Sequence, residues 1–78
     1  MKGKKELKPH LVGKIMRTRR GELGITQEML SMETDISIFK ITRAENGDNL
    51  TLDELYLIGT ALHMPTVFDW LRAGEEFK

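Results

Sequence analysis

Residues 26–47, TQEMLSMETDISIFKITRAENG, contain two short helical patterns separated by only a few residues. Thr26 and Ser37 stand before the two patterns, where a side-chain hydroxyl can accept a hydrogen bond from a free backbone N–H. Gly47 stands where a residue in the left-handed conformation commonly ends a helix. The small apolar face that the two patterns would share consists of Leu30, Ile36, Ile41 and Ala44. The stretch therefore predicts a helix-turn-helix, with helices over about 27–34 and 37–46.

The tight turn of this motif falls at Asp35, where a residue that tolerates positive φ is needed. Ser31 is small, which suits a close approach of the second helix to the first. Met29 and Met32 can be core or surface residues, and the pattern does not decide between these.

The segment before the motif divides into an arm and a helix. Residues 1–8 have almost no apolar content and are expected to form a flexible basic arm. Pro9 suits the first turn of a helix, because its missing N–H costs nothing there. Apolar residues at helical spacing then predict a helix over about 9–20, with one face buried and one face basic.

After the motif, Thr51 and Glu54 have the spacing of a capping box and open a predicted helix that ends near His63. Pro65 prevents its continuation. Five residues are expected on the buried face of this helix, namely Leu52, Leu55, Ile58, Ala61 and Leu62. A last helix is predicted over about 66–73. The fold class is therefore all-α, a compact five-helix domain over residues 9–78.

The last predicted helix carries more large apolar side chains than one face of a short terminal helix can bury in its own small domain. The surplus favours a partner subunit, so this helix is predicted to be a dimerisation helix. Its predicted interface residues are Val67, Phe68, Trp70 and Leu71.

Composition narrows the function classes. The chain has 78 residues, no cysteine and 12 basic against 12 acidic residues, so it fits one domain without disulfides or thiolate metal sites. No apolar run approaches the length of a membrane span, and no signal peptide follows the lysine-rich start, so a soluble cytoplasmic protein is expected. His10 and His63 lack the spacing of a zinc site. No catalytic residue, cofactor or metal is predicted, and an enzyme is not expected.

Charge is distributed unevenly despite the zero net charge. Residues 1–20 hold eight Lys or Arg residues and one Glu, and the remainder of the chain is correspondingly acidic. Such a dipolar molecule could meet a polyanion with its basic end, although a solvated tail and an ordinary helix surface would give the same count.

From about Val12 to Gly74 the chain resembles the Cro and lambda-repressor family of helix-turn-helix DNA-binding proteins, also called the Xre family. Within it, the chain looks most like the controller proteins of restriction–modification operons, with phage repressors and plasmid or antitoxin regulators as close alternatives. The residues that carry the resemblance are Arg20, Gly24-Ile25-Thr26-Gln27-Glu28, Leu30, Ile36-Ser37, Ile41, Glu45-Asn46-Gly47, Leu52, Leu55, Ile58, Ala61, Leu62, Phe68-Asp69-Trp70-Leu71 and Gly74.

The resemblance implies that the second helix of the motif enters the major groove of DNA. The matching base-contacting positions are Ser37, Ile38, Phe39, Thr42 and Arg43, and the matching phosphate-contacting positions are Gln27, Lys40 and Asn46. It also implies a structural ion pair between Arg20 and Glu45. Ile38 and Phe39 depart from the usual polar pattern; they can meet thymine methyl groups, or they can contact the core or a partner.

The function implied is a sequence-specific transcriptional regulator, either repressor or activator, that binds a palindromic operator as a homodimer. Its partners would be double-stranded DNA and a second copy of the chain, with RNA polymerase as a further candidate. The alternative is an antitoxin-type or other protein-binding module on the same fold, which the apolar residues on the supposed DNA face motivate.

Overall fold

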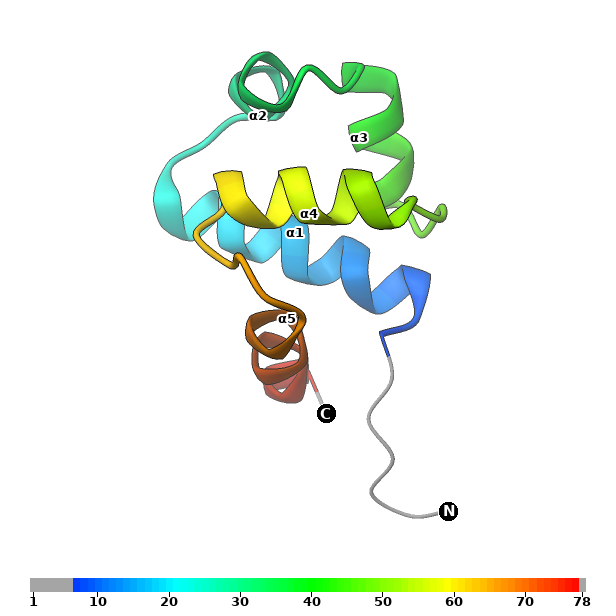
Figure 1. The fold of residues 1–78 in the computed structure, drawn as a ribbon, viewed down its shortest axis with the longest axis vertical. Helices are drawn as coiled ribbons and strands as arrows, with labels where there is room; N and C mark the ends of the chain where they lie inside the picture. Colours follow the sequence, from blue (N-terminus) through cyan, green and yellow to red (C-terminus); the bar gives the residue numbers. More distant parts are fainter. Residues whose placement is uncertain (1–6, 78) are drawn as a thin grey trace.

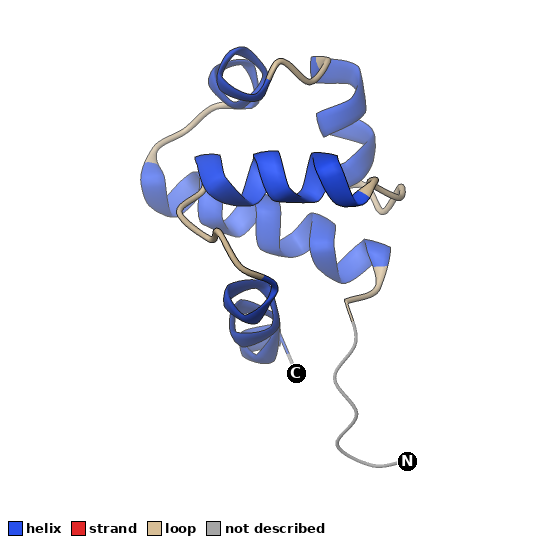
Figure 2. Cartoon of the chain, in the orientation of Figure 1, coloured by secondary structure: helices blue, strands red, loops and turns tan. Residues whose placement is uncertain are grey.

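A computed structural model describes residues 7–77, which form five α-helices and a final 3-10 helix (Figure 1). The elements are α1 (Pro9–Leu23), α2 (Gln27–Thr34), α3 (Ile38–Glu45), α4 (Leu52–Ala61), α5 (Val67–Gly74) and η1 (Glu75–Phe77). Within these residues the cartoon is helix and loop throughout (Figure 2). The predicted all-α class is therefore confirmed.

The helices are arranged along the length of the molecule, with two central helices between its two ends. α2 and α3 lie at one end of the molecule and α5 lies at the other, with α1 and α4 between them (Figure 1). α3 packs against both α1 and α2, and α5 packs against α1. Among the described residues, no helix is both long and apolar enough to cross a membrane.

One hydrophobic core runs between these elements. The apolar face that was predicted for residues 26–47 is buried. Side chains from α1, α4, α5 and the loop before α5 complete the core. Its buried members are Val12, Ile15, Met16, Leu30, Ile36, Ile41, Ala44, Ile58, Ala61, Leu62, Met64 and Trp70.

The ends of α2 and α3 have the predicted local chemistry. The Thr26 hydroxyl accepts a hydrogen bond from the backbone N–H of Met29 at 3.0 Å, and the Ser37 hydroxyl accepts from the N–H of Phe39 at 3.1 Å. Asp35 ends α2 with a φ of 61°, and Gly47 follows α3 with a φ of 107°. These caps fix both helix lengths, because each supplies partners for backbone groups that the helix leaves free.

Helix α1 begins at Pro9, as predicted, and differs from its prediction only at its C-terminal end. It continues through Gly21 to Leu23 and ends at Gly24, whose φ is 70°. Most of the predicted arm lies outside the described residues. Leu7, however, is half-buried and packs against the core, so the arm as predicted extends too far into the folded domain.

The capping box of Thr51 and Glu54 is present, and Thr66 and Asp69 form a second one at the start of α5. Each carboxylate accepts a hydrogen bond from the backbone N–H of its threonine, and this bond lowers the pKa of Glu54 and of Asp69. Leu52 was expected on the buried face of α4. It is 83% exposed, because it is the first residue of the helix and points away from the core.

Trp70 lies in the core of its own chain and is only 2% exposed. Gly59 of α4 makes room for the indole, since a Cβ at residue 59 would lie 2.7 Å from Trp70 Nε1. The prediction that Trp70 belongs to a dimer interface is therefore wrong. Its physical reason is that α5 turns this one ring inward, while Val67 and Phe68 remain exposed and Leu71 is half-buried.

Candidate functional site

The outer face of α3 combines an exposed aromatic ring with polar side chains. Phe39 is 77% exposed, and Ser37, Thr42 and Arg43 are also exposed. Ile38 is half-buried and lines a shallow hollow together with Phe39, Thr42 and Arg43. A single exposed ring is ordinary on a protein surface, so it is the gathering of the ring and several polar side chains on one face of α3 that makes this face a candidate binding site.

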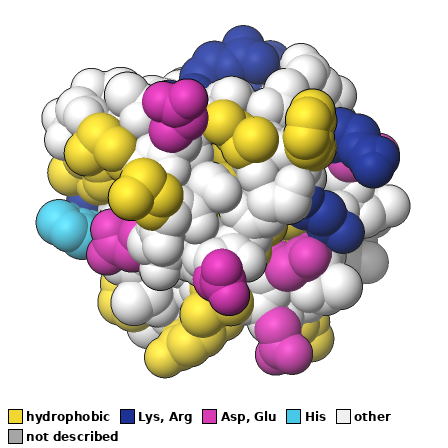
Figure 3. Space-filling model, turned by 90° about the horizontal axis from the view of Figure 1, so that it is seen from above, with side chains coloured by type: hydrophobic (Ala, Val, Ile, Leu, Met, Phe, Trp, Pro, Cys, Tyr) yellow, Lys and Arg dark blue, Asp and Glu magenta, His cyan; other side chains and the backbone are white. Residues whose placement is uncertain are grey.

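Two basic side chains of α3 lie on or beside this face, and each is paired with a carboxylate. Lys40 Nζ lies 3.4 Å from Glu54 Oε2, while Arg43 Nε lies 3.9 Å from Asp48 Oδ2 in a looser, fully surface pair. Seen from the end formed by α2 and α3, Lys and Arg side chains lie toward the top and right, and most acidic side chains lie toward the left and bottom (Figure 3). A polyanion would therefore be attracted to the basic side of this end.

The inner side of α3 is anchored by the predicted ion pair. Arg20 Nε and Nη2 donate to the two oxygens of Glu45 at 2.6 Å and 2.8 Å. The side chain of Glu45 is only 2% exposed. This bidentate geometry raises the pKa of Arg20, chiefly through the hydrogen bonds to Glu45. The pair ties the end of α3 to α1 and so fixes how α3 presents its outer face.

Gln27 joins this pair to the outer face. Its Nε2 donates to Glu45 Oε1 at 3.0 Å, and its Oε1 accepts from the Thr42 hydroxyl at 3.1 Å. Gln27 is the first residue of α2, so it also stands beside backbone N–H groups that a helix start leaves free. The sequence located Gln27 at this helix start, but it gave no sign that the amide would bond to Glu45 and Thr42.

Asn46 follows the last residue of α3, and its side chain forms a hydrogen bond within that helix. Its Nδ2 donates to the backbone carbonyl of Thr42 at 3.0 Å, and this carbonyl also accepts a hydrogen bond from the backbone N–H of Asn46 at 3.2 Å. Asn46 remains exposed, as does Ser37 at the other end. The residues predicted to contact DNA therefore lie on or beside one helix, with Gln27 brought to them from α2.

A second exposed apolar surface lies on α5. Phe68 is 67% exposed, Val67 is exposed, and Leu71 is half-buried beside them. Phe68 and Leu71 line a shallow hollow with Arg72 and Glu75. Three of the four predicted interface residues are thus accessible at the end of the molecule opposite to α3 (Figure 1).

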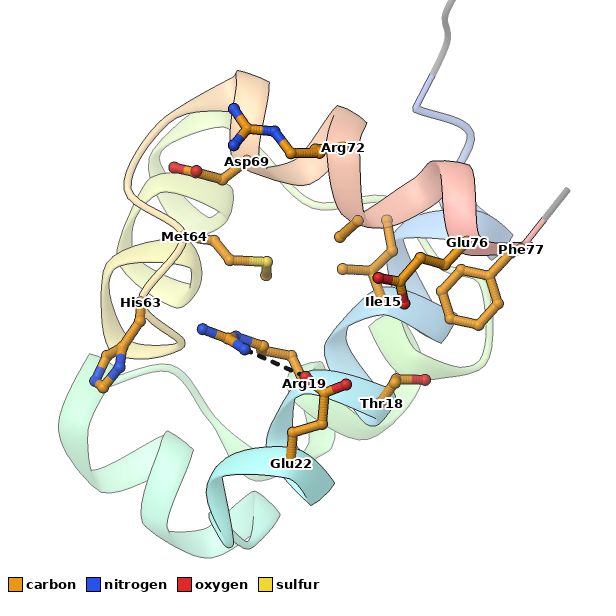
Figure 4. A pocket seen from close by; sticks show the side chains of 11 residues that line it. Ile15, Thr18, Arg19, Glu22, His63, Met64, Asp69, Arg72, Glu76 and Phe77 are labelled. Atoms are coloured by element: carbon orange, nitrogen blue, oxygen red, sulfur yellow. Dashed lines mark hydrogen bonds and ion pairs between the residues drawn. The ribbon is translucent and has the colours of Figure 1, made fainter.

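A cavity of about 230 Å³ lies between α1, α5 and the loop that joins α4 to α5 (Figure 4). The Arg19 side chain that enters it is already paired, since Nε donates to the Leu62 carbonyl at 2.9 Å and Nη1 to Glu22 Oε1 at 3.2 Å. Arg19 thereby caps the end of α4. Over residues 7–77, no group of three or more His, Asp or Glu side chains could hold a metal ion.

Comparison of the chain with models of known protein families, with curated proteins and with solved structures finds no match.

Proposed function

We propose that this chain is a sequence-specific double-stranded DNA-binding transcription regulator with a lambda-repressor-like helix-turn-helix fold, of the Cro and lambda-repressor (Xre) family. It acts by binding and catalyses no reaction. The observation that carries the proposal is the outer face of α3, where exposed Phe39, Thr42 and Arg43 project from a helix whose other side is fixed by a buried ion pair. A rigidly held helix with mixed polar and apolar side chains suits the major groove.

In this proposal, different side chains of α3 make different contacts with the bases. Arg43 can donate two hydrogen bonds to O6 and N7 of guanine, and its loose contact with Asp48 costs little to break. Phe39 and Ile38 offer apolar contact to thymine methyl groups. Ser37 lies at the start of the helix, where its hydroxyl can reach a base edge or a phosphate.

Phosphate contacts would fix the register of α3 in the groove. Gln27 stands at the start of α2, where free N–H groups and the helix dipole favour an anion. Lys40 lies within α3 beside its exposed outer face, and Asn46 lies at the C-terminal end of the helix. The basic residues of segment 1–8 would add contacts to neighbouring phosphates.

The α5 surface makes the protein a homodimer in this proposal. Val67, Phe68 and Leu71 supply an apolar patch that a two-fold axis can pair with its copy. Two copies of α3 would then read half-sites about one helical turn, roughly 34 Å, apart on a palindromic operator.

Selection of bound duplexes from a pool of random DNA tests this function. We expect a palindromic sequence to be enriched, with half-site centres about 10 base pairs apart. In the selected duplex, Lys40→Ala should weaken binding to all sequences alike, because a phosphate contact carries no base information. Failure of the full-length protein to enrich any sequence would overturn the proposal.

A protein-binding module on the same fold is the second candidate, and the exposure of Phe39 together with Met29 and Met32 favours it. These side chains lie on adjacent helices at one end of the molecule. A pull-down from DNase-treated lysate separates the two functions. Recovery of a partner protein in stoichiometric amount, which the selected duplex displaces and which Phe39→Ala no longer binds, would support the second candidate.

A further inference from the structure

The Thr42 hydroxyl is the point at which the buried anchor of α3 meets its reading face. A threonine hydroxyl can in general donate one hydrogen bond and accept two, so it discriminates poorly between bases. In this structure, a chain of three side chains removes that freedom.

The chain begins at the Glu45 carboxylate, which is paired with Arg20 and can only accept hydrogen bonds. The side-chain amide of Gln27 must therefore turn its NH₂ group toward Glu45, which it does at 3.0 Å. This orientation is forced by chemistry, because the reversed amide would set two acceptors against each other.

With the NH₂ group turned toward Glu45, the Oε1 atom of Gln27 faces the Thr42 hydroxyl at 3.1 Å. An amide oxygen can only accept, so the hydroxyl must donate its single hydrogen to Gln27. What Thr42 retains for a ligand is its oxygen lone pairs and its methyl group. Thr42 is exposed, so these groups are available at the surface of α3.

We propose, on the basis of the DNA-binding function above, that Gln27 is a positioning residue that makes Thr42 an acceptor-only reader. Thr42 then selects a base that presents an exocyclic amino group in the major groove, which means adenine through N6 or cytosine through N4. Guanine and thymine present only acceptors at the corresponding atoms, and they are disfavoured because two acceptors would face each other without a hydrogen.

The test uses the full-length protein and a random duplex pool, with parallel selections for the parent and for Gln27→Met, Thr42→Val and Thr42→Ser. The parent should prefer adenine or cytosine over guanine or thymine by roughly fivefold to tenfold at one position of each half-site. Thr42→Ser keeps the hydroxyl and should keep this preference, whereas Thr42→Val should lose it. These two variants identify the position that residue 42 reads.

Gln27→Met frees the Thr42 hydroxyl to rotate and donate. At the position identified by Thr42→Val, its preference should fall to roughly twofold or less, while preferences at other positions persist. Loss of a phosphate contact alone lowers affinity for all duplexes equally and would not change one base preference. Thermal unfolding checks that Gln27→Met is folded, and Gln27→Ala repeats the test with a smaller side chain.

The outcomes separate this inference from the function on which it rests. Unchanged base preferences in both Gln27 variants would overturn the inference and leave the DNA-binding function standing. A parent preference for guanine or thymine at the position altered by Thr42→Val would also overturn it, without any Gln27 variant. A parent that enriches no sequence overturns the proposed function, and the inference falls with it.

Discussion

Helices α3 and α5 have similar sequence patterns but lie in different surroundings. α3 is IFKITRAE and α5 is VFDWLRAG, so each has eight residues, an exposed Phe at the second position and an Arg at the sixth. The fourth position is buried in both, as Ile41 and as Trp70. The fifth position differs in polarity, since it is the polar Thr42 in α3 and the apolar Leu71 in α5.

The kind of partner that an exposed phenylalanine suits depends on the side chains beside it. Phe39 lies beside Thr42 and Arg43, which can exchange hydrogen bonds with a polar ligand. Phe68 lies beside Leu71 and exposed Val67, which suit an apolar protein surface. The two helices are also anchored differently, because α3 is held by a buried ion pair and α5 by a buried indole ring.

The largest effect is expected from the anchor of α5. Trp70→Ala removes a fully buried ring and should lower the free energy of unfolding by about 3–5 kcal/mol, measured by urea denaturation. Phe68→Ala on the same helix is the matched control, and at protein concentrations where the chain is monomeric it should cost less than about 1 kcal/mol. Equal losses for the two variants would show that Trp70 is not the anchor.

The anchor of α3 should give the next largest effect. Arg20→Met removes the bidentate partner of the buried Glu45 carboxylate, which is then left with a 3.9 Å ion pair to Nε of the exposed Arg17, so the free energy of unfolding should fall by about 3 kcal/mol. The matched control is Arg43→Met, whose pair with Asp48 is exposed and 3.9 Å long, and it should cost at most about 1 kcal/mol. A loss for Arg20→Met no larger than that of the control would contradict the anchoring role of the ion pair.

Self-association should separate the two phenylalanines. Phe68→Ala removes the largest exposed ring of the α5 patch and should raise the dimer dissociation constant roughly 30-fold, as sedimentation equilibrium would measure. Phe39→Ala should leave this constant unchanged. If Phe39→Ala dissociates the dimer and Phe68→Ala does not, the α3 surface is the interface and the assignment is reversed.

Acid should affect the start of α5 before the start of α3, and this is the smallest expected effect. The Asp69 pKa is lowered in the folded chain by its hydrogen bond from the Thr66 backbone, so its stabilisation is present above the ordinary value of 3.8 and is lost as the pH falls through the folded value. α3 has no carboxylate in its first turn, and Ser37 caps it without a titrating group.

Amide hydrogen exchange between pH 5 and pH 2.5, roughly the range in which free carboxyl groups titrate, would follow this difference. Protection at the start of α5 should decline first. Asp69→Asn should lower its protection at pH 5 and remove most of the pH dependence. Equal acid sensitivity at the starts of α3 and α5 would contradict the role of the Asp69 capping box.

The sequence was sufficient for the local features of the fold. The bounds of α2 follow from the Thr26 cap and from Asp35 in the left-handed conformation, and both are local effects that adjacent residues determine. The bidentate pair of Arg20 and Glu45 joins distant residues, and it was foreseen only through family resemblance.

The remaining features depend on tertiary packing that no local pattern contains. A run of apolar residues does not reveal which of them turns inward, and Trp70 turns inward because Gly59 leaves space for its indole ring. Leu52 has helical spacing to the core residues but begins its helix beyond the edge of the core. The hydrogen bonds of Gln27 to two residues of another helix likewise required the folded arrangement.

The proposed reading of DNA by α3 rather than α5 is tested most directly by comparing the sixth residues of the two helices, Arg43 and Arg72. Competition binding would use the selected duplex and single-base variants of it, with the parent, Arg43→Ala and Arg72→Ala. The parent and Arg72→Ala should lose roughly 10-fold to 100-fold in affinity when one G·C pair of the half-site is replaced, and Arg43→Ala should bind both duplexes alike. Full discrimination by Arg43→Ala at every base pair would contradict the account.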